Sequence, residues 1–411
     1  MHSSRVWSLR DVAIAWALVV GSGVPTILFS PYDVDQPGSI PAYVLLCVVT
    51  VAIMWTTCMT DGRYRLPEWA AVSVLVSAVM ALATWYGVWG PIIGATSDSL
   101  DALAVGVDQL MKGANPWGAL TFLDNIPSPM LGGFILAVPF VVVPSALFLQ
   151  PLVWLAAFVA FLVRTGGVHV AAVVSVLFFL SPWTRLAFPA GNDHWSVALV
   201  VVLTGTWGYW VLRDDLGGWH WWLSSLAFGV ALSNRFTVWI AVIPLLALWW
   251  RSFDQRGIRW FVPAGVTTLV LVVGPVFVNP TAYLDGPIAV SVGKAEDGAV
   301  AHAAVLVAAS TLLVTALLSW RVRDLAGAWL AVAGGLATLT GVAIMTKIPV
   351  EGWSAIGTYE GTAYNGAWFV FGLIGLAVPR GERTSTTTPG PAIATAADAS
   401  RPSSSRSSAR G

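Results

Sequence analysis

The chain reads LGGFILAVPFVVVPSALFLQPLVWLAAFVAFLV from residue 131 to residue 163, a stretch without a charged side chain. Other apolar stretches of about 18 to 22 residues recur, and as a helix each would match the hydrocarbon thickness of a bilayer. Residues 45–54 and 197–203 lack the alternation of apolar and polar residues that membrane β-strands show. The sequence therefore predicts an all-α, polytopic membrane protein embedded in a lipid bilayer.

The composition of the whole chain has the same character. Of its 411 residues, 57% are hydrophobic and 10% are charged, and its mean hydropathy is +0.76. The 21 basic and 21 acidic residues balance, so the net charge gives no reason to expect nucleic-acid binding. The apolar stretches predict a bundle of about 11 to 12 spans. Cys47 and Cys58 fall in one expected span, too far apart for a disulfide, and the sequence shows no metal-binding cluster.

Tryptophan is abundant, with 23 residues in the chain. Many lie near the expected span ends, where aromatic belts form at the two membrane interfaces. We predict such interfacial positions, apart from some tryptophans that fill the interior, for Trp69, Trp183, Trp195, Trp219, Trp221, Trp222, Trp249, Trp250 and Trp260.

Basic residues mark one end of the expected spans. Arg10 precedes the first apolar stretch, Arg63 follows the second, and Arg321 and Arg380 follow later ones. Because lysine and arginine favour the cytoplasmic side, we predict a multi-pass cell-membrane protein with its N-terminus and C-terminal tail in the cytoplasm. The loop after the third span is then outside.

Residues 131–163 contain three prolines, Pro139, Pro144 and Pro151. These leave two interpretations of the stretch open. Proline kinks or ends a helix, so this stretch could form two spans, or one span preceded by a re-entrant segment. We favour the second interpretation, which requires two passes between residues 221 and 250 with a break near residues 234–235.

Four parts can be distinguished along the chain. We expect an N-terminal transmembrane hairpin in residues 1–68, a membrane core with external acidic loops in residues 69–300, and C-terminal transmembrane helices in residues 301–383. Residues 384–411 are rich in Ser, Thr, Pro and Ala, a composition that cannot bury a core. We expect them to form a disordered cytoplasmic tail.

Polar residues gather in the loops expected outside. Asp98 and Asp101 follow the third expected span, residues 192–194 read Asn-Asp-His, and Tyr359 precedes the last span. Ionisable groups beside a bilayer are costly and tend to mark functional sites, which favours a pocket on the outer face. The alternative is a set of solvated loop residues without a function, since connecting loops are polar in any such protein.

Three short motifs follow one another in the expected core. An acidic residue, an amphipathic stretch and Lys-Gly-Ala-Asn-Pro-Trp occupy residues 101–117, Gly-Asn-Asp occupies residues 191–193, and Ala-Leu-Ser-Asn-Arg-Phe occupies residues 231–236. Their order resembles the GT-C fold glycosyltransferases, integral membrane enzymes that use polyprenyl-phosphate sugars. The resemblance extends over about residues 70–300 and is closest to the bacterial mannosyltransferase-like branch.

The resemblance implies a GT-C-like bundle that transfers a sugar, with mannose as one candidate, from a polyprenyl-phosphate donor to an envelope lipid or glycan acceptor on the outer face. Such a transfer needs a carboxylate that deprotonates the acceptor hydroxyl. Asp101, Asp98 and Asp193 are the candidates, in that order. Because the family usually begins its acidic loop after the first span, Asp33 and Asp35 remain rivals.

Arg235 is the first candidate for substrate binding, since a guanidinium could hold the donor phosphate through paired N–H donors. Equally, it could be a snorkelling arginine at a helix break. His194, Asn192 and Tyr359 are further candidates, although His194 could be an ordinary interfacial histidine. Asp193 or His194 could hold a divalent cation, which is the one cofactor considered.

Two other classes of function stay open. A membrane transporter or lipid flippase would place ionisable residues along a substrate path between broken helices. A non-catalytic membrane protein would need no such path. The charges lie in loops rather than at mid-membrane, and the sequence shows no internal repeat, which favours the enzyme.

Overall fold

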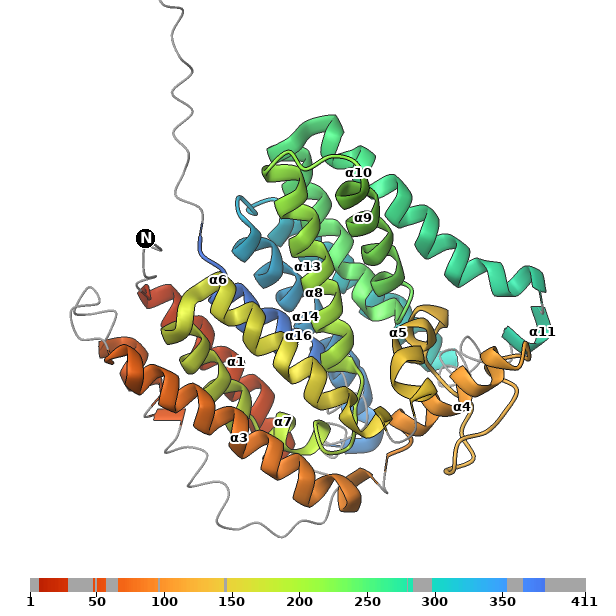
Figure 1. The fold of residues 1–411 in the computed structure, drawn as a ribbon, viewed down its shortest axis with the longest axis horizontal. Helices are drawn as coiled ribbons and strands as arrows, with labels where there is room; N and C mark the ends of the chain where they lie inside the picture. The colour runs from red at the N-terminus through yellow and green to blue at the C-terminus, as the bar shows by residue number, and fades with distance from the viewer. Residues whose placement is uncertain are drawn as a thin grey trace, which may run out of the picture. The chain divides into compact units, whose positions relative to one another are not determined.

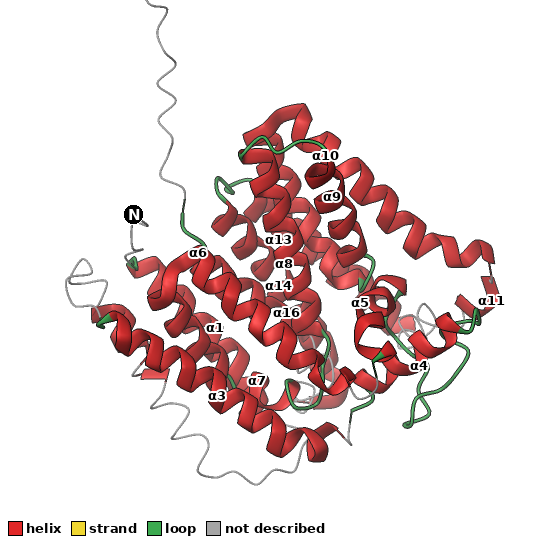
Figure 2. Cartoon of the chain, in the orientation of Figure 1, coloured by secondary structure: helices red, strands yellow, loops and turns green. Residues whose placement is uncertain are grey.

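The computed structural model describes residues 7–28, 47–48, 50–56, 66–94, 97–143, 146–278, 280–283, 298–352 and 365–380. Over these residues the chain forms helices and connecting loops, with no strand (Figures 1 and 2). The prediction of an all-α fold is confirmed for them. The expected tail of residues 384–411 lies outside the described residues, as do Asp33, Asp35 and Tyr359.

Within the described ranges, five stretches are long and apolar enough to cross a membrane, judged by length and composition. They contain the helices α3 (Glu68–Ile93), α6 (Gln150–Leu180), α8 (His194–Arg213), α10 (Val242–Val278) and α14 (Leu325–Glu351). The chain is therefore a multi-pass helical membrane protein, as its apolar stretches predict.

Helix α6 reverses direction at Gly167. An unbroken helix would separate Phe158 from Phe178 by about 30 Å along its axis, yet their ring centroids lie 5.1 Å apart. Gly167 adopts φ 79° and ψ 172°, a region of backbone conformation that is essentially restricted to glycine. Helix α6 therefore supplies two limbs, residues 150–166 and 168–180, that pack against each other.

Helix α10 reverses in the same way at Asp254, which adopts φ 50° and ψ −136°. Trp249 and Trp260 would be about 16 Å apart in an unbroken helix, yet their rings stack with centroids 5.1 Å apart. Gly257 allows the close return, because an added Cβ there would lie 2.9 Å from the carbonyl oxygen of Trp249.

The interior is built around α8 and α16 (Asn365–Ala377). Helix α16 packs on α14, α8, α6 and α1 (Leu9–Leu28), while α14 also packs on α13 (Gly298–Ser319). Helix α9 (Trp219–Leu232) packs on both α8 and α10. Two glycines of α8 admit large aromatic rings: an added Cβ at Gly205 would lie 2.9 Å from Trp329, and one at Gly208 would lie 2.2 Å from Trp260.

The tryptophans divide between the interior and the helix surface. Four of those expected near span ends are buried, and these fill the interior, as predicted for some: Trp183, Trp195, Trp249 and Trp260. The interfacial prediction remains open for four others, which are exposed: Trp69, Trp219, Trp222 and Trp250. Nearness to the end of an apolar stretch does not reveal which face of the helix a side chain occupies, and that face decides its burial.

The segment before α6 leaves and re-enters one end of the bundle. Helix α5 (Leu131–Val142) has a length of about 18 Å, which is short of the roughly 30 Å hydrocarbon core. Gly133 near its start and Gln150 at the start of α6 line the same small cavity. The geometry agrees with the re-entrant interpretation. It also agrees with the expected break near residues 234–235, which separates α9 from η3 (Phe236–Ala241) and α10.

Helix α8 relates the two ends of the bundle to each other, since its 20 residues span about 30 Å. Asp193 precedes the helix. At the other end Arg164 lies over the ring of Trp210, 5.5 Å from its centroid, and Arg256 forms an ion pair with Asp215 just beyond the helix. Arg164 and Arg256 thus lie at the end of α8 opposite to Asp193.

We predict that cysteines at the two ends react with an impermeant maleimide from opposite sides of the membrane. In a background without Cys47 and Cys58, Ala114→Cys should be labelled from one side, and Gly217→Cys and Ser252→Cys from the other. All three positions are exposed. Labelling of all three from the same side of sealed vesicles would contradict the arrangement of the ends.

We predict that Gly167→Ala destabilises the protein by about 1–3 kcal/mol, because alanine is strained at the glycine conformation that reverses α6. An added Cβ at Gly167 meets no atom within 4 Å, so the cost is conformational rather than steric. Gly265→Ala is the matched control, because Gly265 is helical and also has open space around it. Thermal unfolding in detergent should show a lower unfolding temperature for Gly167→Ala and an unchanged one for Gly265→Ala.

Candidate functional site

A shielded ion pair joins Asp193 and Arg235 at the end of the bundle where α8 begins. The Nη2 of Arg235 lies 2.7 Å from Oδ2 of Asp193, and its Nε lies 3.2 Å from the same oxygen. Only 6% of the Asp193 side chain and 15% of the Arg235 side chain are exposed. Removing either partner would therefore leave a charge with little solvent to stabilise it.

Both residues stand where a helix is interrupted. Asp193 follows Gly191, whose φ of 67° turns the chain into α8. Arg235 is extended, with φ −147° and ψ 140°, between α9 and η3. A helix break leaves backbone groups without intrahelical partners. One of them, the carbonyl of Asn234, accepts a hydrogen bond from the amide N–H of Met130 at 3.2 Å.

Arg235 also fastens the loop that leads into α5. Its Nη1 donates to Oγ of Ser128 at 2.9 Å, and the amide N–H of Gly132 donates to the carbonyl of Ser233 at 3.3 Å. An added Cβ on Gly132 would lie 2.2 Å from Oγ of Ser233, so this approach requires glycine. The start of the re-entrant segment is thus held against the break after α9.

The charge of Arg235 determines the protonation state of Asp193. Burial by itself would raise the pKa of this carboxyl group, but the adjacent Arg235 guanidinium, with smaller help from His194, outweighs burial and holds the pKa below its ordinary value. Asp193 is therefore an ionised carboxylate at neutral pH. A carboxylate stabilised in this way is poorly suited to accept a proton, because an effective general base has a pKa nearer the working pH.

Asn192 and His194 shape the start of α8. The side-chain oxygen of Asn192 accepts a hydrogen bond from the backbone N–H of His194 at 2.9 Å, which is the pattern of an Asx turn. His194 is buried directly beside Asp193. These positions account for both residues structurally, and their expected part in substrate binding stays a prediction.

Asp98 and Asp101 hold the loop of residues 113–130 over α4 (Ser99–Met111). Oδ2 of Asp98 accepts hydrogen bonds from Oγ1 of Thr121 at 2.7 Å and Nδ2 of Asn125 at 2.9 Å. Oδ2 of Asp101 accepts one from the backbone N–H of Phe122 at 2.7 Å. Each carboxylate uses one oxygen in this way, and the other oxygen forms no hydrogen bond within the described residues.

Helix α4 brings these carboxylates to the same end of the bundle as the ion pair without joining the two groups. Leu100 packs so closely on Gly191 that an added Cβ there would lie 2.5 Å from it. Leu100 also lines a small cavity together with Asp193. Asp98 and Asp101 line neither this cavity nor its neighbour. The structure therefore brings Asp193 and Arg235 into contact and keeps Asp98 and Asp101 apart from them.

Two residues that the sequence does not predict, Gln150 and Asn234, line a cavity of about 10 Å³ beside Asp193. Both are buried, and their side-chain oxygens have no hydrogen-bond partner within the described part of the chain. Buried acceptors are normally paired, so this cavity suits a small hydrogen-bond donor. A sequence signal exists for Gln150, because it is an amide inside the apolar stretch 131–163.

Among the residues that the structure describes, no three His, Cys, Asp or Glu side chains group in a way that could hold a metal ion. Comparison of the chain with known protein families, with curated proteins and with solved structures gives no match. The chemistry of the site therefore follows from its own geometry.

We predict that Arg235→Met lowers stability by about 3–5 kcal/mol, because it leaves the Asp193 carboxylate shielded and unpaired. The double variant Asp193→Asn with Arg235→Met should recover much of that loss, which a double-mutant cycle of thermal unfolding in detergent would measure. Arg256→Met is the control, because Arg256 pairs with the exposed Asp215 and exposed pairs contribute little.

The pH dependence provides a second measurement of the same pair. The pKa of Asp193 is lowered in the folded protein. The ionised carboxylate therefore contributes to the free energy of unfolding above the unfolded-state pKa of about 3.9, and this contribution is lost as the pH falls through the folded-state pKa. The stability gap between wild type and the double variant should therefore narrow below about pH 4. A double variant as unstable as the sum of its single changes would contradict the coupling.

Proposed function

We propose that the protein is an integral membrane glycosyltransferase, which transfers a sugar from a polyprenyl-phosphate donor to an envelope lipid or glycan acceptor on the outer face. The observation that carries the proposal is the arrangement of α4. The start of this helix presents Asp98 and Asp101 at the bundle end that also holds Asp193 and Arg235. Within the described residues, one oxygen of each carboxylate forms no hydrogen bond.

In the proposed reaction the acceptor hydroxyl oxygen bonds to the anomeric carbon of the sugar, and the bond from that carbon to the phosphate oxygen breaks. The proton of the hydroxyl passes to a carboxylate, and the polyprenyl phosphate departs with the bonding electrons. Asp101 is the first candidate for the base and Asp98 the second. Asp193 is the weakest candidate, because Arg235 stabilises its ionised form.

Arg235 is the candidate that would stabilise the departing phosphate. Its guanidinium already donates to Asp193 and Ser128, so phosphate would have to share it with Asp193. The five N–H donors of a guanidinium permit such sharing, whereas the ammonium of lysine would not hold the same fork. Asn192, His194 and Tyr359 remain proposed substrate contacts.

The proposed membrane topology has about 11 to 12 spans in a GT-C-like bundle, with the N-terminus and the C-terminal tail in the cytoplasm. The reversals of α6 and α10 support it, because each of these helices then makes two passes. The gathering of Arg164 and Arg256 at one end of α8 supports the orientation, since arginine favours the cytoplasmic side.

A transporter or lipid flippase is the second candidate, and one observation favours it. The helix break at Asn234 and Arg235 carries a charge pair with little exposure, and transporters bind substrates where helices are interrupted. Counterflow of a labelled lipid-linked sugar in liposomes, without sugar transfer, would favour this candidate.

We predict that Asp101→Asn lowers sugar transfer about 10² to 10⁴-fold, because the amide keeps the size of the side chain and removes the base. The assay uses purified protein with labelled polyprenyl-phosphate mannose and an envelope lipid extract. Asp108→Asn is the matched control, because Asp108 lies on the same helix and is exposed in a pair with Lys112. The side-chain amide of the Asp101 variant can still accept the hydrogen bond from Phe122 through its oxygen, so folding should be retained.

Wild-type turnover in both Asp101→Asn and Asp98→Asn would remove α4 from the catalytic proposal. Asp33 and Asp35 would then be the carboxylates to replace. If these four variants and Asp193→Asn all kept activity, the transfer reaction would not depend on any carboxylate proposed for it.

A further inference from the structure

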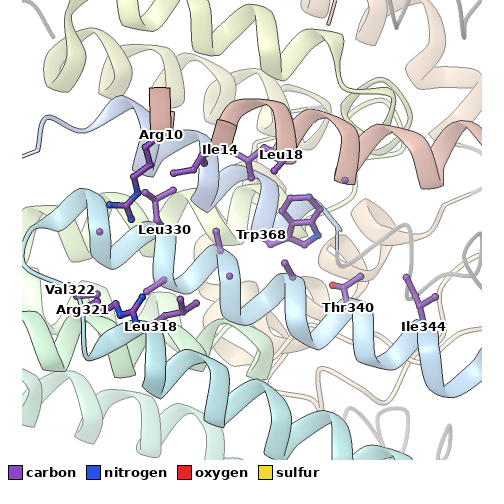
Figure 3. Close-up of a pocket in the computed structure, with 18 residues that line it drawn as sticks. Arg10, Ile14, Leu18, Leu318, Arg321, Val322, Leu330, Thr340, Ile344 and Trp368 are labelled. Carbon is purple, nitrogen blue, oxygen red and sulfur yellow. The ribbon is translucent and has the colours of Figure 1, made fainter. Parts of the chain in front are cut away.

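A large groove lies between α1 and α14, at a distance from the carboxylates of α4. Both helices pack on α16, and Trp368 of α16 lies in the groove between them, as Figure 3 shows. The groove has a volume of about 680 Å³, within the range of sites for small molecules. Small residues are frequent in its lining, among them Gly21, Ala331 and Gly334.

The lining is apolar along its length and basic at one end. The lining residues of α14 extend from Gly327 to Ile344, about 25 Å along the helix. Arg10 and Arg321 lie together at one end, as Figure 3 shows, while Thr340 and Ile344 lie toward the other. No carboxylate lines the groove among the described residues.

The nearest carboxylates on the flanking helices have partners of their own. Asp11 accepts from Arg380 at 2.6 Å and from the Ser8 hydroxyl at 2.7 Å. Asp324 accepts from the amide N–H of Gly327 at 2.6 Å and caps α14. Neither carboxylate forms an ion pair with Arg10 or Arg321, so the described residues provide no counter-charge at this end of the groove.

A buried hydroxyl group lies further along the groove. Thr340 is 3% exposed, lines the groove, and its Oγ1 has no hydrogen-bond partner among the described residues. Threonine in a helix commonly donates to the carbonyl four residues earlier, as Thr338 does toward Gly334. A buried polar atom left unpaired is costly, so Thr340 is a polar position in an otherwise apolar part of the lining.

We propose that the groove binds one anionic phospholipid, whose phosphate lies between Arg10 and Arg321 and one of whose acyl chains lies along the small-residue face of α14. Paired guanidinium groups match the charge and geometry of a phosphate, and arginine at a helix end reaches the headgroup region of a bilayer. The apolar stripe provides a surface for the chain in place of protein side chains. This site is independent of the proposed sugar transfer.

The first experiment tests whether binding requires both the anionic headgroup and the acyl chains of the lipid. Detergent-solubilised protein is titrated with phosphatidylglycerol, phosphatidylcholine or inorganic phosphate, and binding is followed by thermal unfolding and native mass spectrometry. We expect saturable stabilisation and one retained molecule with phosphatidylglycerol, much weaker effects with phosphatidylcholine, and none with inorganic phosphate. Equal binding of the two lipids, or protection by inorganic phosphate alone, would overturn the proposal.

The second experiment tests the residues. The double variant Arg10→Gln with Arg321→Gln should bind phosphatidylglycerol about 30-fold more weakly, from the attraction of two arginines to anionic lipid. Arg323→Gln is the control, because Arg323 is exposed close by in the sequence and does not line the groove. Unchanged affinity in the double variant would overturn the phosphate site.

A groove-filling variant tests the chain-binding surface separately. Gly341 lines the groove, and an added Cβ there meets no atom within 4 Å, so Gly341→Phe should fold and displace the acyl chain while both arginines remain. Gly265→Phe is the control, with similar open space outside the groove. Unchanged lipid retention in Gly341→Phe, or a wild-type mass showing a second copy of the chain in place of lipid, would overturn the proposal.

Discussion

The pair of Asp193 and Arg235 is the interaction on which this end of the bundle depends. It joins the start of α8 to the break after α9, and through Ser128 it reaches the loop that enters α5. Each charge is tolerable only while the other is present, because little of either side chain is exposed. Because the two charges must stay paired, the start of α8, the break after α9 and the loop that enters α5 are held together although they are far apart in the sequence.

The sequence predicts the helical membrane class and the approximate ends of the passes, because apolar length and positive charge are properties of the local sequence. Arg164 and Arg256 lie near two chain reversals as that pattern indicates. The residues that make the turns, Gly167 and Asp254, depend on backbone conformation. At Asp254 the charged residues within 251–259 interrupt the apolar pattern and mark the turn. The apolar pattern does not indicate the turning residue itself in either helix.

For the candidate site, the residue types in the sequence indicated which residues to consider, but they did not indicate which of those residues are in contact. Asp193 and Arg235 are conspicuous as charges beside apolar stretches, but their contact arises from two separate helix interruptions. The hydrogen bonds of Asp98 and Asp101 to the following loop have no periodic signature either. Which tryptophans are buried was not indicated for a related reason, since the burial of Trp260 depends on a glycine in another helix, Gly208.

The arginines of the bundle differ in the source of their counter-charge. Arg235 is largely shielded and receives a carboxylate from the protein. Arg380, partly shielded, likewise pairs with the buried Asp11. Arg10 and Arg321 are exposed, and an arginine at that depth can take its counter-charge from the phosphates of the membrane at little cost. The proposed phospholipid would thus supply Arg10 and Arg321 with the counter-charge that Asp193 and Asp11 supply to Arg235 and Arg380.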